Sequence, residues 1–515
     1  MNFIDKVIFF VSPRAALSRQ KNRMAYNFLA KRFFEGAGKG RRTEGWLTPG
    51  TSANAENAGA TITLRNRARD LIRNNAFASR AVQVIVSNVV GYGIKTQLKN
   101  ESGRGAKEIQ KVWNKWSSSV AADFDGRRDY YGLQDLVMRT IVESGECLVV
   151  RKRMASSEGE IPLKLQILEP DFIDTSRSDD KTEQGIQFDS SGRRTGYWLF
   201  KSHPGDVGIR SFFQRKKIES ELIPAEDVLH CYRQDRAGQI RGVTWYAPVI
   251  ITMRELDEYM DATIVKQKVS AAFAAFVHDI EAGGDLENNP PLSEKLEPGA
   301  IEILPPGKDI KFPNPPSVNE FDPFTRTMLR ACASGLGITY EAFTSDYSQV
   351  NFSSGRMGWL EFHRNIESWR WNMLIPQFCN PVVKWFIEAA ELRGIRANGV
   401  RPMHTPPSRE MIDPNAESNA LVTQIRAGLK TLPEALRELG HDPEEKLAEI
   451  AETNAELDRL GLILDVDPRR VMKASGSLQP SSEPAPTEPQ PQERFFVDDK
   501  QRLWEKNGNG FRLVK

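Results

Sequence analysis

The side chains that most often build catalytic and metal sites are widely spaced in this chain. Its 515 residues include six histidines and four cysteines, which form neither a C-x-x-C pair nor an H-E-x-x-H motif. His230 and Cys231 are adjacent, but neighbouring strand residues point to opposite faces, so they are poorly placed as base and nucleophile. We therefore predict no catalytic residue, no metal site and no cofactor.

Glycine-rich phosphate-binding motifs are also missing. The pattern G-x-x-x-x-G-K-[ST] does not occur, and the nearest glycine cluster, residues 36–40 (GAGKG), follows no strand pattern. A P-loop ATP motor is therefore disfavoured. A nuclease with dispersed carboxylates would leave no short motif, so that alternative stays open.

Charge is balanced over the whole chain but not along it. The totals are 70 Lys and Arg against 68 Asp and Glu, a net charge of +2, whereas proteins that hold DNA by counterion release usually carry a basic surplus. Residues 1–42 hold ten basic and two acidic residues, a net charge of +8. Residues 433–467 hold three basic and eleven acidic residues, a net charge of −8. The two ends suit different partners, or each is simply a solvated surface.

The composition is that of a soluble globular protein, with 40% hydrophobic and 27% charged residues. No apolar run reaches the roughly 18–20 residues of a membrane span. The scattered cysteines fit a reducing compartment. We expect a soluble, cytosolic protein that does not associate with membranes.

Helical and strand patterns predict an α+β domain over residues 60–240, after a flexible connection at 36–60. One helix is expected from a cap at Thr63 or Asn66, and others over 106–118 and 130–143. Short apolar runs at 147–151, 163–168, 186–188 and 195–200 indicate strands. Most of the arginines on the first helical stretch are expected to be solvated: Arg65, Arg67, Arg69, Arg73 and Arg80.

A long helix is the most informative feature of the middle of the chain. Residues 249–282 lack Gly and Pro, so a fully helical stretch would be roughly 50 Å long. Residues 283–318 contain eight prolines and two strand-like pieces, 300–304 and 309–312. The helical pattern then resumes at 324–335. Two helices thus leave and re-enter one body, with a compact β module at their tips.

The C-terminal third begins with a polar loop over residues 343–355. A Trp-rich, buried helical segment follows, interrupted at Pro376 and Pro381. Residues 415–461 read as acidic helices, and residues 476–492 as disordered. The last 23 residues could form a hairpin around Asn507-Gly508 or a docking peptide.

Several segments together resemble the portal proteins of tailed bacteriophages, specifically the lambda-like branch. The likeness covers residues 60–465 and rests on the order and spacing of its pieces. They are residues 67–75 (RARDLIRNN), 87–93 (SNVVGYG), 223–230 (IPAEDVLH), 236–242 (RAGQIRG), 297–299 with 304–307, 335–341 (GLGITYE) and 346–356 (DYSQVNFSSGR).

The resemblance implies an α+β portal-like subunit with an α/β wing, a two-helix stem, a small β-containing clip and a helical crown. The segments it assigns are a basic arm and connection (1–59), wing (60–242), first stem helix (243–282), clip (283–318), second stem helix (319–339), tunnel loop (340–356), Trp-rich wing helix (357–395), acidic crown (396–475) and Pro-rich tail (476–515).

The function implied is that of a conduit rather than an enzyme. The family forms a ring, usually of twelve copies, at one capsid vertex, where double-stranded DNA passes without sequence readout during packaging and ejection. Implied partners are the terminase large subunit, major capsid protein, scaffold and a head–tail adaptor, with no membrane. The implied location is the virion portal vertex, and the host cytoplasm during assembly. A near-neutral chain suits passage of DNA better than capture.

Two groups of site residues follow from the resemblance. Arg356 would contact phosphate or pair with Glu361, and we favour the pair. The DNA-proximal tunnel-loop residues would be Asp346, Tyr347, Gln349, Asn351 and Arg356. The clip residues that contact terminase or adaptor would be Lys295, Glu297, Lys308, Asp309 and Lys311.

Two alternatives compete with the conduit. One is an enzyme of the packaging machinery, an ATPase or nuclease, which an ATPase assay would reveal. The other is a DNA-binding module that uses the basic N-terminal arm; deletion of residues 1–42 would then abolish DNA association without affecting assembly.

Overall fold

The computed structural model describes most of residues 51–462 and three short strands near the C-terminus. The gaps in the main stretch are 101–105, 156–159, 207–218, 272–275, 280–307, 312–320 and 409; of residues 1–50 only scattered ones are described, and after 462 only Leu464 and the strands within 495–513. The chain divides into two units. Unit 1 comprises Met1–Val82, Thr140–Leu148 and Leu168–Leu336, and unit 2 comprises Gln83–Arg139, Val149–Ile167 and Gly337–Lys515.

From residue 51 onward, unit 1 contains two consecutive helices, α3 (Ala53–Ala58) and α4 (Thr61–Asn74), before the start of α5 (Ala76–Val89). The predicted caps of α4 are wrong, because the helix already begins after Ala60 and Thr63 and Asn66 lie inside it. Only Gly59 and Ala60 separate α3 from α4, so the chain is already helical before it reaches Thr63. On α4, Ala68, Leu71 and Ile72 are buried.

The strands of unit 1 form small sheets, of which the four-stranded one is antiparallel. One sheet has the order β4-β5-β6-β7, with β4 (Thr182–Glu183), β5 (Ile186–Phe188), β6 (Arg194–Phe200) and β7 (Ser220–Pro224). Another has the order β3-β2-β8, with β2 (Glu146–Lys152), β3 (Lys164–Leu168) and β8 (Val228–Tyr232); β2 and β3 contribute residues to both units. The expected α+β class is confirmed.

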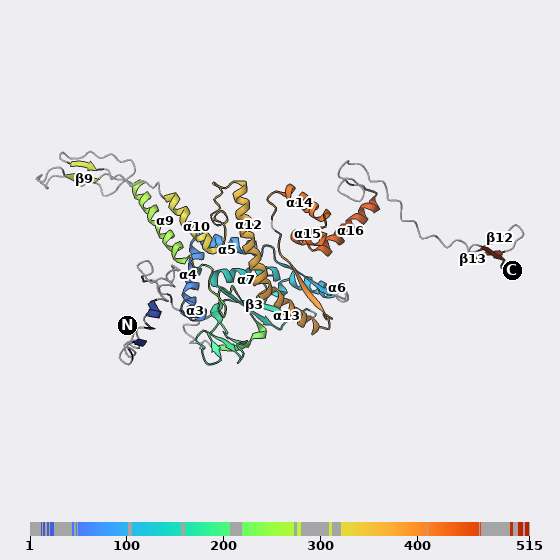
Figure 1. The fold of residues 1–515 in the computed structure, drawn as a ribbon, viewed down its shortest axis with the longest axis horizontal. Coiled ribbons are helices and arrows are strands. Elements are labelled where there is room, and N and C mark those ends of the chain that lie inside the picture. The colour runs from blue at the N-terminus through green and yellow to red at the C-terminus, as the bar shows by residue number, and fades with distance from the viewer. Residues whose placement is uncertain are drawn as a thin grey trace. The chain divides into compact units, whose positions relative to one another are not determined.

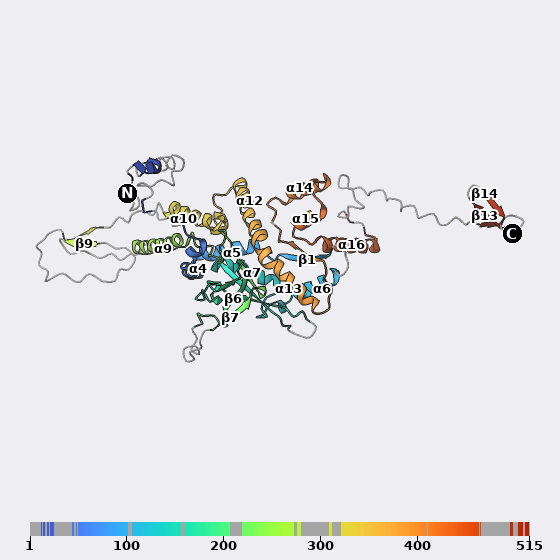
Figure 2. The same cartoon turned by 60° about the horizontal axis from the view of Figure 1, so that its bottom comes forward.

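Two helices of unit 1, α9 (Ile250–Ala271) and α10 (Phe321–Leu336), lie side by side (Figures 1 and 2). Gly335 of α10 permits a close approach, because a Cβ there would be 2.4 Å from Val249 Cγ1. Further along the pair, the Tyr259 ring lies 4.9 Å from the Phe324 ring, measured between centroids. The pair has the arrangement that the sequence predicted, but its first helix is shorter.

Helix α9 ends at Ala271 rather than at the predicted residue 282. Residues Phe276–Asp279 form strand β9, which pairs antiparallel with β10 (Lys308–Lys311). The Phe-Val pair at 276–277 favours a strand once Lys311 and Ile310 lie opposite it. The predicted strand at 309–312 is thus confirmed as β10, whereas the predicted strand 300–304 and most of the proline-rich module lie outside the described residues.

Unit 2 has an aromatic core between helices. Helix α6 (Ala106–Ser117) and helix α7 (Tyr130–Ser144), which ends in unit 1, occur as predicted. Trp113 packs edge-on against Phe386, with 4.9 Å between centroids, and Tyr130 stacks on Phe378. Strand β1 (Lys95–Asn100) pairs antiparallel with β11 (Val400–Thr405), which brings distant parts of the sequence together.

The Trp-rich segment is continuous rather than interrupted. Helix α12 (Phe352–Trp369) runs into a π-helical segment (Arg370–Cys379) and then α13 (Asn380–Glu391). Pro376 lacks the N–H that an α-helical bond would need, and the wider π turn accommodates it. Of the four tryptophans only Trp385 is buried, and Trp371 is 49% exposed. The expected heavy burial is nevertheless found from Arg370 to Ala390, where the π-helical segment and α13 each bury six residues.

The acidic region forms three capped helices, α14 (Pro414–Arg426), α15 (Leu432–Glu438) and α16 (Pro443–Leu460), as predicted. Near the C-terminus β12 (Phe495–Val497), β13 (Leu503–Asn507) and β14 (Gly510–Leu513) form one sheet. Asn507 pairs with Gly510, which confirms the hairpin. The predicted disordered stretch 476–492 lies outside the described residues. Among those that are described, no helix is long and apolar enough to cross a bilayer.

Candidate functional site

The predicted tunnel loop is shorter than its sequence suggested. Helix α11 (Tyr340–Thr344), capped by Thr339, occupies its start, and α12 already begins at Phe352. Only residues 345–351 remain outside helices. Ser345 turns the chain out of α11 in the left-handed conformation, with φ of 60°.

Asp346 and Asn351 use their side chains to shape this loop. Asp346 Oδ2 accepts a hydrogen bond from the Tyr340 hydroxyl (3.1 Å), and its Oδ1 accepts one from the Ser348 amide (3.0 Å). Asn351 caps α12 by accepting from the Ser354 amide at 2.9 Å. Both residues were predicted to approach DNA; in the structure both Asp346 oxygens and the Asn351 Oδ1 accept hydrogen bonds from the loop and its flanking helices.

Tyr347 and Gln349 form the outward part of the loop. Both are exposed, and the Tyr347 side chain is 62% accessible. The base beneath them is held in place, because Phe343 is buried and Asn365 of α12 donates a hydrogen bond to the Gly337 carbonyl (3.0 Å). The loop therefore presents an aromatic ring and an amide from a fixed base.

Arg356 lies exposed on the second turn of α12. The favoured pairing with Glu361 is wrong: in the described part of the chain Arg356 makes no ion pair. Five residues separate the two, which places them about 140° apart around a helix. Phe352, four residues before Arg356 on the helix, and Met357, directly after it, are 62% and 73% exposed.

The predicted clip residues divide into two groups. Lys308, Asp309 and Lys311 lie on β10, where the register places Lys308 opposite Asp279 and Asp309 opposite His278. Lys295 and Glu297 lie outside the described residues.

A buried charged cluster in unit 1 was not predicted. Glu146 at the start of β2 accepts hydrogen bonds from Arg241 Nε (3.0 Å to each oxygen), from His230 Nε2 (2.9 Å) and from the Gly242 amide (2.8 Å). Burial alone would raise the pKa of Glu146, but Arg241 and His230 hold it well below its ordinary value. Burial lowers the pKa of His230, so its neutral ring donates to an ionised carboxylate. The cluster fixes the 241–242 segment against β2.

One sequence signal could have indicated this cluster. A carboxylate that opens an otherwise apolar strand, as Glu146 does before CLVV, requires a buried cationic partner. The partner lies nearly a hundred residues away, and no local pattern identifies it.

The second unpredicted cluster joins α4 to residues 169–203. Arg65 Nη2 lies 3.0 Å from Asp171 Oδ1, and Arg69 Nη2 lies 2.7 Å from Asp171 Oδ2 and 3.1 Å from Glu169. Arg65 is 3% exposed and Arg69 is half-buried, so these two are exceptions to the expected solvation, whereas Arg67, Arg73 and Arg80 are exposed as expected for most of the five. Arg65 shares a face with Ala68 and Ile72, at spacings of three and seven, and that pattern was the available signal.

Glu169, Asp171 and His203 of this cluster are close enough to hold a metal ion, with ligand atoms within 4.8 Å. The donor set does not fit one. The Arg69 guanidinium already occupies both carboxylates. His203 Nδ1 accepts from the Gly205 amide (3.0 Å), so the ring proton is on Nε2, which faces Glu169. The cluster is an ion-pair network.

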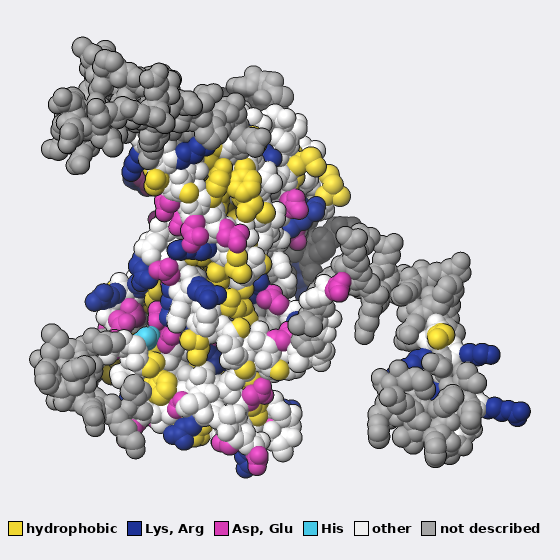
Figure 3. Space-filling model, turned by 90° about the vertical axis from the view of Figure 1, so that its left-hand side faces the viewer, with side chains coloured by type: hydrophobic (Ala, Val, Ile, Leu, Met, Phe, Trp, Pro, Cys, Tyr) yellow, Lys and Arg dark blue, Asp and Glu magenta, His cyan; other side chains and the backbone are white. Residues whose placement is uncertain are grey.

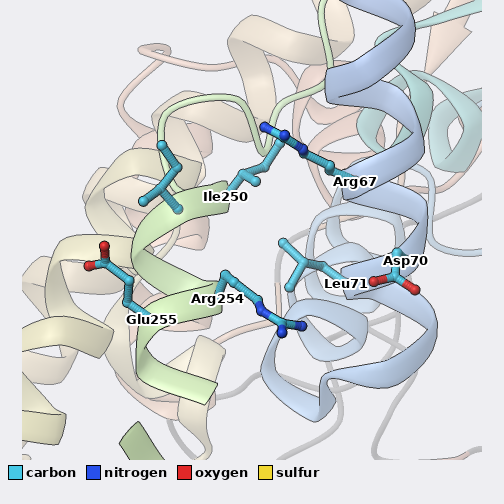
Figure 4. A pocket seen from close by; sticks show the side chains of 7 residues that line it. Arg67, Asp70, Leu71, Ile250, Arg254 and Glu255 are labelled. Carbon is cyan, nitrogen blue, oxygen red and sulfur yellow. The ribbon is translucent and has the colours of Figure 1, made fainter. Parts of the chain in front are cut away.

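A pocket of about 430 Å³ lies between α4 and α9 of unit 1 (Figure 4). Leu71 and Ile250 form its apolar part, and Arg67 and Arg254 line it beside Asp70 and Glu255. Because the rim carries both signs of charge, the pocket selects neither anions nor cations. On the face shown in Figure 3, basic and acidic side chains are likewise interspersed with hydrophobic ones.

Comparison with models of protein families identifies the family of this chain. The model of the lambda family of phage portal proteins matches residues 39–370, more than half of the chain. The chain belongs to this portal family. The matched portal-family residues include both unit 1 ion clusters, the α9–α10 pair and the loop at 345–351.

Relatives of this portal-family chain include the probable portal protein of Halomonas phage phiHAP-1, 26% identical over 431 residues that cover 78% of this chain and 81% of that protein. The portal protein of Escherichia phage N15 is 21% identical over 481 residues, which cover 83% of this chain and 90% of that protein. Portal protein B of Escherichia phage lambda is 21% identical over 362 residues, which cover 62% of this chain and 67% of that protein.

Similar chains also occur in solved structures. One lies in the neck of an empty gene transfer agent particle, with 14% identity, a TM-score of 0.47, and coverage of 75% of this chain and 94% of that chain. Another is an HK97-family phage portal protein from Corynebacterium diphtheriae, with 10% identity and a TM-score of 0.28. The match covers 61% of this chain and 86% of that chain.

Proposed function

We propose that the chain forms a ring at one capsid vertex, through which double-stranded DNA passes during packaging and ejection. The match of residues 39–370 to the portal family is the observation that carries this proposal. The ring would have twelve copies, contact major capsid protein and scaffold, and dock the terminase large subunit and later a head–tail adaptor. It would act in the virion, after assembly in the host cytoplasm, without a catalytic step of its own.

The subunit regions are proposed with boundaries adjusted to the helices and strands. Helices α9 and α10 would form the stem, and the β9–β10 pair the base of the clip. Helices α14, α15 and α16 would form the crown. A closed ring needs a heterologous interface, in which two different surfaces of one subunit meet those of its neighbours.

The loop at 345–351 would face the tunnel and meet DNA through Tyr347 and Gln349. Neither side chain carries a charge at neutral pH, so contacts with phosphate would release few counterions and bind DNA weakly. Asp346 would act indirectly by fixing the loop through Tyr340 and Ser348. Weak contacts suit a conduit in which DNA must slide.

Negative-stain electron microscopy of the purified full chain tests the ring. We expect closed rings with a central channel wide enough for a DNA duplex, roughly 20 Å across or more. The experiment is repeated with capsid protein and scaffold added, so that a ring that assembles only with these partners is also detected. Monomers under both conditions would contradict the proposal.

A further inference from the structure

The N-terminal half of α12 makes little contact with the rest of the described chain. No residue from 352 to 361 is buried, and Phe362 is the first that is. Met357 is 73% exposed and Leu360 is 39% exposed. The helix is nevertheless well formed, because Asn351 caps its first turn. A second surface that covered these apolar side chains would stabilise this half of the helix.

Four residues of this half form one stripe along α12. Leu360 and Met357 lie about 40° and 100° around the helix from Arg356. Glu361 lies about 140° from Arg356, so the two charged residues border the two apolar ones. Phe362, which packs against the body, lies about 240° from Arg356 and thus on the opposite side. We call Arg356, Met357, Leu360 and Glu361 the α12 stripe.

The charged residues at the two borders of the α12 stripe are unpaired in the described part of the chain. Arg356 and Glu361 are both exposed, and neither makes an ion pair there. Other charges of the helix have partners: Glu367 lies 2.7 Å from Arg370 and 3.8 Å from His363. The stripe therefore presents one free cation and one free anion on opposite edges.

The order of residues in the α12 stripe is that of one heptad in a parallel helix pair. With Arg356 at position g, Met357 takes position a, Leu360 position d and Glu361 position e. In such pairs a and d make the apolar contact, and a g residue pairs with the e residue of the neighbouring helix, five positions on. The spacing that prevents this ion pair within one helix therefore permits it between two helices. Arg364 takes the next a position, so the apolar contact is limited to one heptad.

A second copy of this chain is the partner that suits all four side chains. Duplex DNA would attract Arg356, but its phosphates would repel Glu361 and leave Met357 and Leu360 in water. A neighbouring copy offers Glu361 to Arg356 at one edge, and the copy on the other side offers Arg356 to Glu361. Because two different edges meet, the contact is heterologous and repeats from copy to copy, as a closed ring requires.

We infer that the α12 stripe of each copy packs parallel against that of the next copy in the ring, with Arg356 of one paired with Glu361 of the other. This inference rests on the proposed ring and adds a specific contact beside the loop at 345–351, which directly precedes α12. One heptad does not hold free helices together, whereas the ring keeps neighbouring copies at high effective concentration. The contact would fix the loops of adjacent copies relative to one another.

Reversal of the two charges tests the pair. Arg356→Glu and Glu361→Arg, each alone, place like charges at every contact and should lower the proportion of copies in rings roughly tenfold in negative-stain images. The double variant Arg356→Glu with Glu361→Arg restores opposite charges and should recover assembly. The two residues do not meet within one chain, so such recovery arises only between copies. Single variants that assemble normally, or a double variant that does not recover, would overturn the inference.

Two exposed charges elsewhere in unit 2 provide the matched control. Glu391→Arg and Arg393→Glu make the same changes of net charge near the end of α13. Both should leave the proportion of copies in rings unchanged. A loss equal to that of the α12 variants would show that net charge alone governs assembly, and would overturn the inference.

Cysteine cross-linking measures the contact itself. The four native cysteines are buried, so Arg356→Cys copies and Glu361→Cys copies react at the new sites alone. A short bis-maleimide should join the two variants in mixed rings more efficiently than it joins copies of either variant alone. Rings without this preference would overturn the inference and leave the proposed conduit unaffected. Absence of rings from the unaltered chain, even with capsid protein and scaffold, would contradict both.

Discussion

Arg241 and Glu146 face each other in the interior of unit 1, with the arginine Nε 3.0 Å from both carboxylate oxygens. The Glu146 side chain is fully inaccessible and that of Arg241 is 3% exposed. Neither charge could be buried alone, because an unpaired ion in the interior costs several kcal/mol. The pair therefore couples the start of β2 to a segment almost a hundred residues later.

Arg241→Gln should destabilise the protein by about 3–5 kcal/mol, since it leaves the Glu146 charge buried with only His230 and an amide as partners. Chemical denaturation followed by far-UV circular dichroism measures the loss. Arg254→Gln, an exposed arginine on α9, is the control and should change stability by less than about 1 kcal/mol. Similar losses in both variants would mean that the buried pair contributes little.

Stability should fall as the pH falls from 6.5 towards 4, and His404 should cause part of the loss. Burial lowers the pKa of His404 from 6.5 to about 4. Between these values the unfolded chain binds a proton that the folded chain does not, so acid favours unfolding, by about 3 kcal/mol at most for this group. His404→Gln should flatten the pH dependence of unfolding in this window. An unchanged slope would show that His404 titrates normally.

Gln349→Lys should slow DNA passage if the loop faces the tunnel, because it adds one phosphate contact per subunit around the ring. The rate of DNA packaging into proheads that contain the variant ring measures the effect, which should weaken with added salt. Gln349→Glu is the matched control and should not retard DNA. An unchanged rate in assembled rings would place the loop elsewhere.

Gly335→Leu should separate α9 from α10. A Cβ at this position would lie 2.4 Å from Val249 Cγ1, so a large side chain forces the helices apart at a cost of about 1–3 kcal/mol. Val249→Ala should recover part of the lost stability in the double variant. Thermal unfolding of the single and double variants measures this, and purely additive losses would argue against the contact.

Local patterns in the sequence were sufficient to predict elements whose stability is set nearby. The helical pattern over residues 106–118 predicted α6, and Asn507 with the following glycine indicated the C-terminal hairpin as one of two possibilities. The order of short motifs also predicted the portal family. Periodicity and turn chemistry are properties of a few consecutive residues, so they can be seen in a single chain.

Tertiary structure decided the features that depend on distant partners. Arg65 and Arg69 can be withdrawn from water because Asp171, about a hundred residues later in the sequence, pairs with both of them. Glu146 can be buried because Arg241 pairs with it. Helix α9 ends early where β10 offers a strand partner to residues 276–279. Asp346 turns inward because Tyr340 is within reach once α11 forms. In each case the free-energy cost of desolvating a polar group is offset by a contact that exists only in the folded protein. The spacing of residues along the sequence does not show which distant residue makes that contact.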